Sequence, residues 1–471
     1  MLLKPFFLEK ISHASYILAG KETCAVVDPR RDTEIYIDEA RSLGVKITHI
    51  LQTHLHADFI SGHLELAGKT GAQIHVAASA RCRFEHVPLA EGSRITIEDM
   101  VLDVLETPGH TPEHLSYVVT DTARGASPVG AFVGDTLFVG DVGRPDLFPD
   151  RASELAERLH DSLHEKLLAL PDYCEIYPAH GAGSLCGRAM GDKRLSTVGY
   201  ERRHNAALQI RDRSEFVRSL TSHMPPVPDH FGRCSDINRE GPVLLSALPE
   251  VEELSPARFE MRMLDPAVVL DIRSYSAFAG SHIPGAWHLD LNGNFPTFAG
   301  WVLPGDRDIL LVADRYGDVI EAVRWARRVG VDRIAGCLDG GMVDWVNAGK
   351  RVSGICLLSA EALHERITGT AGLVLVDVRA PSEFGENHIE GAVNIQAPDL
   401  RTRHRELDPQ KPVALICSSG NRSSLAASML KSYGFEEVYN VAGGMTGYSA
   451  AGYTKTCSVC ENPHGSRFGG A

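Results

Sequence analysis

Short apolar runs that end at a polar or charged side chain recur along the first 180 residues. Four of these runs lie directly before a side chain that can bind a metal, and we predict a β-strand for each: Ile47–Gln52 before His54, Val101–Glu106 before His110, Ala131–Val133 before Asp135 and Cys174–Tyr177 before His180. Groups at the ends of neighbouring strands can converge on one point. The pattern therefore predicts a site assembled from distant parts of the chain.

A different pattern fills the C-terminal half, where apolar runs such as Val413–Ile416 alternate with helical patterns such as Leu425–Leu430. This alternation is typical of a parallel sheet covered by helices. The half also contains an internal repeat, since Val268–Arg273 matches Leu373–Arg379 and an aromatic residue and a His-Ile-x-Gly-Ala stretch follow each. We predict two copies of one α/β module of about one hundred residues.

The chain length requires several domains, because 471 residues exceed what one hydrophobic core supports. The prolines in 224–228 mark the exit from the first domain. We place the first domain at 1–245, the two α/β modules at 246–355 and 356–455, and a tail at 456–471.

Composition and charge exclude several classes of protein. Hydrophobic residues make up 44% and charged residues 23%, as in globular proteins. The net charge of −14 repels phosphate backbones and anionic lipids, so we expect neither nucleic acid nor a membrane as partner. The apolar stretch at the start of the chain is too short for the core of a signal peptide, and no later stretch is apolar enough to span a membrane. We therefore expect a cytoplasmic protein.

Ten cysteines are scattered without the spacing of a secreted disulfide scaffold, so most should be buried, inert thiols. Cys457 and Cys460 could form a redox pair or half of a zinc site. The Gly-rich end of the chain favours a disordered tail instead.

Residues 54–58 read His-x-His-x-Asp and place His54, His56 and Asp58 within five positions. A single histidine is more often a satisfied structural residue than a metal ligand. Here, however, three further candidates follow in the order His, Asp, His. Together they favour a metal site.

This order, spread over residues 10–225, resembles the metallo-β-lactamase superfamily, which implies an αββα fold. The stretches at 107–114, 134–146 and 177–181 are similar to its glyoxalase-II and persulfide-dioxygenase branch. The resemblance to persulfide dioxygenases implies three metal ligands and three groups around them: His54, His110 and Asp135 as ligands, and His56, Asp58 and His180 as supporting or pocket residues.

Two histidines and one carboxylate leave three coordination positions open, as in non-haem Fe(II) oxygenases. Glyoxalase-II enzymes hold a second metal with a histidine directly after the motif aspartate, and that position is Phe59 here. Because a benzyl group cannot ligate, we expect one Fe(II) per chain. Zinc in the same ligands, with thioester hydrolysis as the activity, stays open.

Three arginines are candidate substrate ligands through the same resemblance, namely Arg144, Arg202 and Arg203. A guanidinium suits the carboxylates of glutathione, which it can bind through two parallel hydrogen bonds. For Arg202 and Arg203, a solvated helix face with surface ion pairs is an equally open interpretation.

Cys417 opens a tight loop and Arg422 closes it, between an apolar strand and a helical pattern. Backbone N–H groups in such a loop, a helix N-terminus and a guanidinium favour the thiolate, which predicts a nucleophile rather than an inert buried thiol. The loop and its flanking motifs over 357–452 resemble rhodaneses, which implies catalytic roles for Cys417 and Arg422. Cysteine phosphatases have five residues between the cysteine and the arginine of this loop, whereas this chain has four. Phosphatase activity is therefore the weaker interpretation.

In the first copy, Asp314 stands where the nucleophile would be and Val319 where the arginine would be. Since a carboxylate cannot carry a persulfide, we predict that this module is structural. His282 and His388 occupy matching positions of the two copies, which favours a structural role for both.

The three-part order resembles bacterial fusions of a persulfide dioxygenase with rhodanese domains. It implies that a thiol persulfide, for example glutathione persulfide, reacts with O2 to give sulfite and thiol, and that Cys417 moves sulfur between persulfide, sulfite and thiosulfate. A zinc thioesterase and a persulfide-binding sensor or carrier are the alternatives. The carrier thiol, the direction of sulfur transfer and homo-oligomerisation stay open.

Overall fold

The computed structural model describes residues 1–222, 224–369 and 372–454, so the predictions for Cys457 and Cys460 fall outside the described residues. The chain divides into two compact units, of which the first comprises Met1–Leu248 with Ala326–Gly330. The second comprises the rest of the chain from Pro249. Over the described ranges, no helix is both long and apolar enough to cross a membrane.

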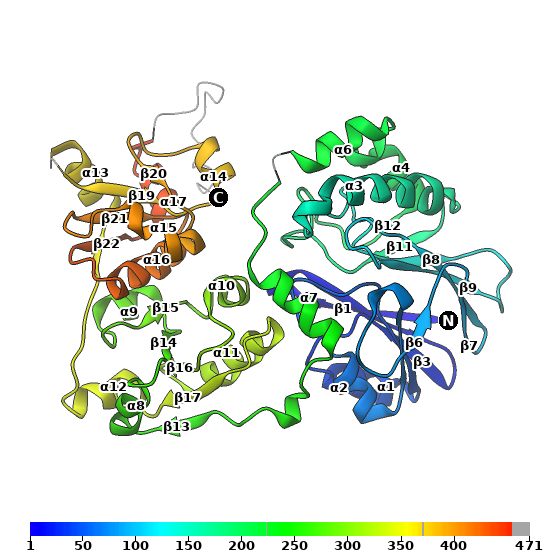
Figure 1. Cartoon of the computed structure of the whole chain (residues 1–471), viewed down its shortest axis with the longest axis horizontal. Coiled ribbons are helices and arrows are strands. Elements are labelled where there is room, and N and C mark those ends of the chain that lie inside the picture. Colours follow the sequence, from blue (N-terminus) through cyan, green and yellow to red (C-terminus); the bar gives the residue numbers. More distant parts are fainter. Residues whose placement is uncertain (223, 370–371, 455–471) are drawn as a thin grey trace, which may run out of the picture. The chain divides into compact units, whose positions relative to one another are not determined.

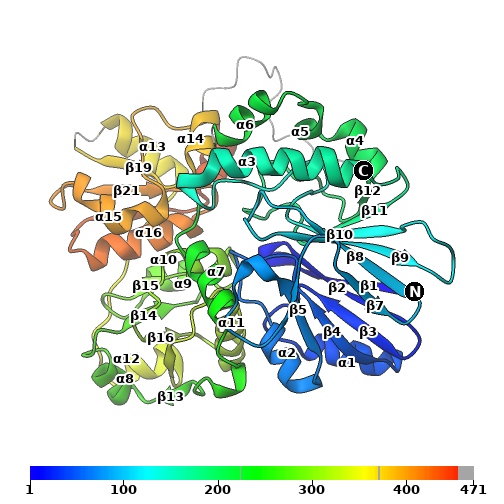
Figure 2. The ribbon, with the colours of Figure 1, turned by 45° about the vertical axis from the view of Figure 1, so that its right-hand side comes forward.

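Two six-stranded sheets form the first unit (Figure 2). The first sheet has the order β1 (Leu2–Leu8), β2 (His13–Ala19), β3 (Thr23–Val27), β4 (Lys46–Leu51), β5 (Gln73–Ala77), β6 (Val87–Leu89). The second has the order β12 (Ser196–Thr197), β11 (Glu175–Pro178), β10 (Gly130–Gly134), β9 (Leu115–Asp121), β8 (Met100–Glu106), β7 (Arg94–Ile97). Each of the four strands predicted before a metal-capable side chain is present, within two residues of its expected bounds.

Helices cover the outer faces of both sheets. Two lie on the first sheet, α1 (Glu34–Leu43) and α2 (His63–Thr70). Others lie along the second: α3 (Ala152–Asp161), α4 (Val198–His204), α5 (Ala206–Gln209) and α6 (Arg213–Thr221). A further α-helix, α7 (His230–Glu240), follows α6 in the chain. This is the expected αββα arrangement.

The alternation of side chains along β2 shows why the sandwich forms. Tyr16 and Leu18 point into the core between the two sheets, while Ile17 and Ala19 point toward α1 and α2. Because both faces of the strand are buried, its second half, residues 16–19, is a continuous apolar run rather than an alternating one. The loops that follow such strands carry the polar residues of the site.

The second unit contains two parallel five-stranded sheets (Figure 1). The first has the order β13 (Glu252–Leu254), β17 (Ile334–Leu338), β16 (Ile309–Val312), β14 (Val268–Asp271), β15 (Trp287–His288). The second has the order β18 (Cys356–Leu358), β22 (Val438–Val441), β21 (Val413–Ile416), β19 (Val374–Asp377), β20 (Val393–Asn394). The two sheets share one topology, as the internal repeat predicts.

Each sheet of the second unit is accompanied by its own helices. Those of the first copy are α8 (Pro256–Arg262), α9 (Tyr275–Gly280), α10 (Phe295–Val302), α11 (Tyr316–Arg328) and α12 (Gly341–Asn347). Those of the second are α13 (Ala360–Gly369), α14 (Pro381–Glu386), α15 (Leu400–Arg403), α16 (Asn421–Ser432) and α17 (Gly444–Ala450).

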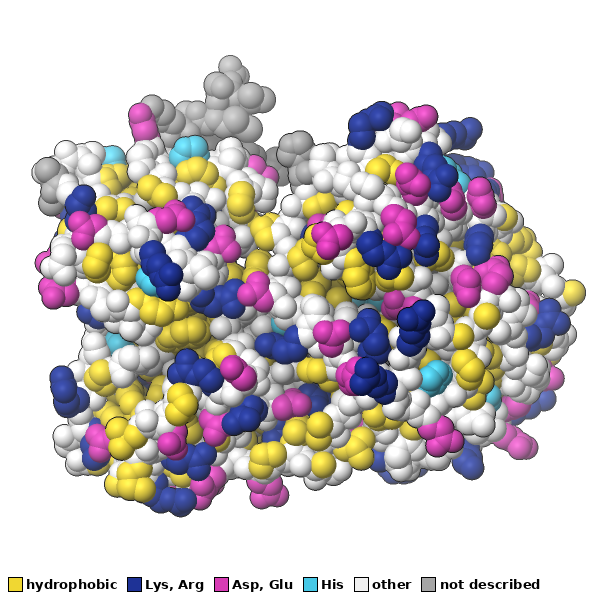
Figure 3. Space-filling view, viewed as in Figure 1, with side chains coloured by type: hydrophobic (Ala, Val, Ile, Leu, Met, Phe, Trp, Pro, Cys, Tyr) yellow, Lys and Arg dark blue, Asp and Glu magenta, His cyan; other side chains and the backbone are white. Residues whose placement is uncertain are grey.

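The two copies contact each other directly. The backbone N–H of His288 donates to Ser428 Oγ at 2.9 Å, and the Trp287 indole donates to Ser432 Oγ at 3.1 Å. These bonds join β15 of the first copy to α16, the helix that begins in the Cys417 loop. On the face in Figure 3, basic and acidic side chains are interspersed over the surface.

Candidate metal centre and sulfur-transfer loop

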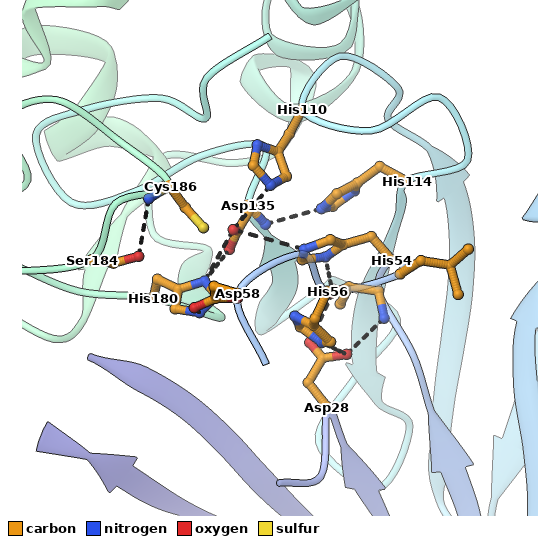
Figure 4. Close-up of polar contacts among 12 residues, drawn as sticks. Asp28, His54, His56, Asp58, His110, His114, Asp135, His180, Ser184 and Cys186 are labelled. Atoms are coloured by element: carbon orange, nitrogen blue, oxygen red, sulfur yellow. Dashed lines mark hydrogen bonds and ion pairs between the residues drawn. The ribbon is translucent and has the colours of Figure 1, made fainter. Parts of the chain in front are cut away.

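Three buried side chains from separate strand ends converge in the first unit (Figure 4). Ligand atoms of His54, His110 and Asp135 all lie within 4.8 Å of one another. The two imidazole Nε2 atoms lie 3.7 and 3.3 Å from Asp135 Oδ2. The structure thus brings together the three residues that were predicted as ligands.

The orientation of both histidines suits a metal. Thr53 Oγ1 lies 2.9 Å from His54 Nδ1, and His110 Nδ1 lies 2.9 Å from the carbonyl oxygen of Arg144. These contacts turn the Nε2 atoms toward the centre, where both find no hydrogen-bond partner among the residues that the structure describes. Burial lowers the pKa of both imidazoles and so favours the neutral form that ligates metals.

His114 supports the centre from behind. Its Nε2 accepts a hydrogen bond of 2.9 Å from the backbone N–H of Asp135, and its ring stacks on His54 at 4.9 Å. Burial lowers the pKa of His114 to about 3, which keeps the imidazole neutral. We had not predicted this role, although His114 ends the 107–114 motif.

The predicted supporting residues lie beside the triad. His180 lies between two carboxylates, with Nδ1 2.7 Å from Asp135 Oδ1 and Nε2 2.9 Å from Asp58 Oδ2. Burial opposes its protonation, but the two carboxylates raise the pKa of His180 well above its usual value. His56 lies 3.2 Å from Asp28, an aspartate that the sequence reasoning did not single out although it follows directly on β3.

A second group of possible ligands lies next to the first. Asp58, His180 and Cys186 are all buried, and their ligand atoms also lie within 4.8 Å of one another. Phe59 is buried against His13, with ring centroids 4.1 Å apart, and offers no ligand atom. Sequence reasoning missed Cys186, whose only signal is its position six residues after His180. One metal per chain stays a prediction.

The predicted substrate arginines are engaged in contacts within the protein. Arg144 is buried, forms a bidentate pair with Asp146 at 2.6 and 2.7 Å, and donates to the Leu185 carbonyl. Arg202 and Arg203 both pair with Asp172 on the exposed face of α4. The surface ion pairs are therefore present, and substrate binding by the three arginines stays a prediction that this arrangement does not favour.

The Cys417 loop presents a sulfur to neutral hydrogen-bond donors. Cys417 Sγ accepts from the N–H of Gly420 at 3.1 Å and from the Ser423 hydroxyl at 3.3 Å. Gly420 has φ 106°, a conformation that favours glycine, and it precedes the first residue of α16. The loop thus directs two hydrogen-bond donors at the sulfur.

A glycine pair supports the loop from below. The backbone N–H of Met445 donates to the Cys417 carbonyl at 2.7 Å. Gly444 has φ 54°, and a Cβ there would lie 2.1 Å from that same carbonyl oxygen. The close approach therefore requires glycine.

Arg422 does not stand alone at the end of the loop. Its Nη1 and Nη2 donate to the Glu383 carboxylate at 2.6 and 2.8 Å, and Nη2 also donates to Ser418 Oγ at 2.7 Å. Hydrogen bonding from Arg422 lowers the pKa of Glu383 to about 2. Sequence reasoning missed Glu383, although it directly precedes the aromatic residue that the repeat aligns.

A cavity of about 230 Å³ lies over this loop and is shared by both copies. Its lining residues are Leu289, Asp290, Gly293, Asn294 and Phe298 from the first copy and Ser418, Ser419, Asn421, Arg422 and Leu425 from the second. The first copy therefore does more than hold the fold together, because it supplies a wall of the cavity beside the predicted nucleophile.

The matching loop of the first copy has lost the chemical groups. Asp314 has a side chain 62% exposed, and Val319 is buried. His282 and His388 each stack on the preceding aromatic residue, at 3.9 and 4.1 Å. Both histidines thus make the same local contact, in agreement with the structural role predicted from their matching positions.

Comparisons with known families support the domain types of this chain. The metallo-beta-lactamase superfamily pattern matches residues 9–180, and the rhodanese-like domain pattern matches twice, at 255–348 and 359–451. The chain belongs to the metallo-β-lactamase superfamily and carries two rhodanese-like domains in its C-terminal part.

Individual relatives cover about half of this chain. The chain is 36% identical over 229 residues to a hydroxyacylglutathione hydrolase of Pseudomonas entomophila, covering 49% of this chain and 74% of that protein. It is 30% identical over 240 residues to the mitochondrial persulfide dioxygenase ETHE1 of Bos taurus, covering 49% of this chain and 85% of that protein.

One solved structure extends further. A metallo-beta-lactamase from Staphylococcus aureus is similar at 34% identity and a TM-score of 0.65, covering 72% of this chain and 98% of that one. The homologues imply a metal-dependent enzyme with rhodanese domains.

Proposed function

We propose that the first unit oxidises a low-molecular-weight thiol persulfide, with glutathione persulfide as the leading candidate, at one Fe(II) held by His54, His110 and Asp135. The balanced reaction is RSSH + O2 + H2O → RSH + sulfite + 2 H⁺. The observation that carries the proposal is the convergence of these three ligands beside a position that Phe59 fills with carbon. The similarity to ETHE1 supports it.

The chain's own residues prepare this centre. Thr53 and the Arg144 carbonyl orient the two imidazoles, and Asp135 contributes the negative charge that a divalent cation requires. Fe(II) bound there would supply the one-electron chemistry through which O2 reacts. His180 holds its protons toward Asp135 and Asp58 and so reduces the repulsion between these buried carboxylates.

We further propose that Cys417 carries sulfane sulfur. Sulfite can accept this sulfur from the Cys417 persulfide to give thiosulfate and the thiolate, and the reverse reaction loads the cysteine. The neutral donors from Gly420 and Ser423 support both states of the sulfur.

A zinc thioesterase is the second candidate. The similarity to a hydroxyacylglutathione hydrolase favours it, as does the Asp58, His180 and Cys186 group, which could hold a second ion. The two candidates differ in the identity of the metal, in the metal count and in the need for O2.

Metal analysis and an oxygen electrode test the proposal on the purified full chain. We expect about one iron per chain and oxygen uptake with glutathione persulfide, with sulfite released. Two zinc ions with thioester hydrolysis would establish the second candidate, and binding of persulfide without turnover would indicate a sensor or carrier. Cys186→Ser should leave the iron content unchanged, whereas a fall from two ions to one would identify an occupied second site.

Asp135→Ala should lose both iron and oxygen uptake, because it removes the only anionic ligand. Asp150→Ala, at an exposed aspartate, is the matched control and should retain both. Retained metal and activity in a folded Asp135→Ala protein would show that another carboxylate binds the metal.

A further inference from the structure

Arg422, Glu383 and Ser418 form a cluster in which each side chain hydrogen-bonds to the other two. Two guanidinium nitrogens are bonded to Glu383, and one of them also bonds to Ser418 Oγ. The Ser418 hydroxyl in turn donates to Glu383 Oε1 at 3.0 Å. The guanidinium N–H groups that an arginine would use to bind an anion through two hydrogen bonds therefore already donate to a carboxylate of the same domain.

The first copy of the repeat shows which contacts belong to the fold alone. Both copies keep a buried pair two residues apart, Asp271 with Arg273 and Asp377 with Arg379, and the closest bond is 2.7 Å in each. Glu383, by contrast, aligns with Ala277 of the first copy. Glutamate is thus absent from the copy that also lacks the cysteine and the arginine.

The groups that touch the sulfur are neutral. Cys417 Sγ is bonded to a backbone N–H and to a hydroxyl, while the guanidinium charge is matched by a carboxylate. Hydrogen bonding from Arg422 keeps Glu383 ionised at neutral pH. The net charge of the pair is therefore zero under working conditions.

We propose that Glu383 is a positioning residue for sulfur transfer, which with Arg422 forms a neutral clamp that holds the loop without adding net positive charge beside Cys417. The inference rests on the proposed transfer at Cys417. Thiosulfate loads the loop when the Cys417 thiolate attacks its outer sulfur, the new S–S bond forms, the old one breaks, and sulfite leaves with the electron pair. Without the Glu383 carboxylate, the positive charge of Arg422 would slow the release of anions such as sulfite. The neutral pair removes this retention.

Two alkylating reagents test the charge at Cys417 without requiring any turnover. Iodoacetate is anionic and iodoacetamide is neutral, and peptide mass spectrometry follows the modification of Cys417 in the full chain. We compare the variants by the rate with iodoacetate divided by the rate with iodoacetamide. Because the fraction of thiolate and the accessibility of the sulfur affect both rates alike, this ratio reports the local charge. One unit charge removed near the sulfur should change this ratio about threefold to tenfold.

Glu383→Gln should raise the ratio, because the guanidinium loses its counter-charge, and Arg422→Gln should lower it. The double variant should return to within about twofold of the wild-type ratio. Glu383→Asp keeps the charge and should leave the ratio near the wild-type value. Glu386→Gln, an exposed carboxylate on the same helix, is the matched control.

Thiosulfate kinetics supply the second readout. Glu383→Gln should lower the KM for thiosulfate and also lower kcat, since sulfite would leave more slowly. An unchanged reagent ratio, or a double variant that departs further than either single one, would overturn the inference. If the ratio shifts as expected but the protein transfers no sulfur, the neutral clamp is supported and the proposed function of Cys417 is refuted.

Discussion

The two rhodanese-like copies share a fold and differ in chemistry. Their sheets have the same strand order, and both keep the Asp-Arg pair and the stacked histidine. Among the positions at which their sequences differ, three carry ionisable groups of the proposed chemistry in the second copy: Cys417, Arg422 and Glu383 are replaced by Asp314, Val319 and Ala277 in the first copy. The comparison teaches that the module folds without its reactive loop and that these three groups belong together.

Burial reinforces the contrast. Cys417 is 1% exposed and its sulfur has two donors, whereas the Asp314 side chain is 62% exposed. A carboxylate gains hydration in that exposed position. The first copy contributes residues such as Asp290 and Phe298 to the shared cavity, so part of its surface lies beside the Cys417 loop although it lacks the cysteine.

The largest effect should follow from Cys417→Ser, which leaves the second copy, like the first, without a thiol in this loop. We expect thiosulfate formation and cleavage to fall by about a thousandfold or more, because a serine hydroxyl is not ionised at neutral pH. Oxygen uptake with an external persulfide should continue. Loss of oxygen uptake in a folded, iron-loaded variant would show that the persulfide must pass through Cys417 first.

A matched pair of glycine substitutions should separate loop geometry from fold. A Cβ at Gly444 would lie 2.1 Å from the Cys417 carbonyl oxygen, and one at Gly341 would lie 2.5 Å from that of Ala313. Both residues have positive φ, so each alanine should cost about 1–3 kcal/mol. Gly444→Ala should lose sulfur transfer tenfold or more, measured with thiosulfate, while folded Gly341→Ala should retain most of it. Equal losses would mean that the two loops are coupled.

Acid should weaken the second copy through Glu383. Hydrogen bonding from Arg422 holds its pKa at about 2 in the folded protein, below the ordinary 4.5. A lowered pKa contributes stability that is present above pH 4.5 and is lost as the pH falls toward 2. The advantage in melting temperature of wild type over Glu383→Gln should therefore shrink between pH 6 and pH 3. A constant difference across this range would contradict the assignment, and Glu386→Gln serves as control.

The smallest effect should come from Asp314→Ala. The side chain is exposed and its closest cation, Arg273, is 3.9 Å away, so the substitution removes only a weak surface contact. Thiosulfate turnover and oxygen uptake should both stay within about twofold of wild type. A large loss of sulfur transfer in a normally folded variant would give the first copy a chemical role.

Local patterns in the sequence determined much of this protein. Short apolar runs predicted β4, β8, β10 and β11, because a strand that packs into a core needs apolar residues on at least its inward face. The internal repeat predicted two like modules, of which the second has Cys417 and Arg422 where the first has Asp314 and Val319. The four strand ends predicted that His54, His110, Asp135 and His180 converge, and the resemblance to persulfide dioxygenases implied which three of them are ligands.

Only the tertiary structure decided which residues surround these groups. Cys186 approaches Asp58 and His180 from a loop with no distinguishing pattern, and the buried Arg144 donates to the backbone carbonyls of Leu185 and Pro225. Glu383 meets Arg422 across 39 positions of sequence. Such contacts depend on how elements pack, and because packing joins residues that are distant along the chain, no local periodicity encodes them.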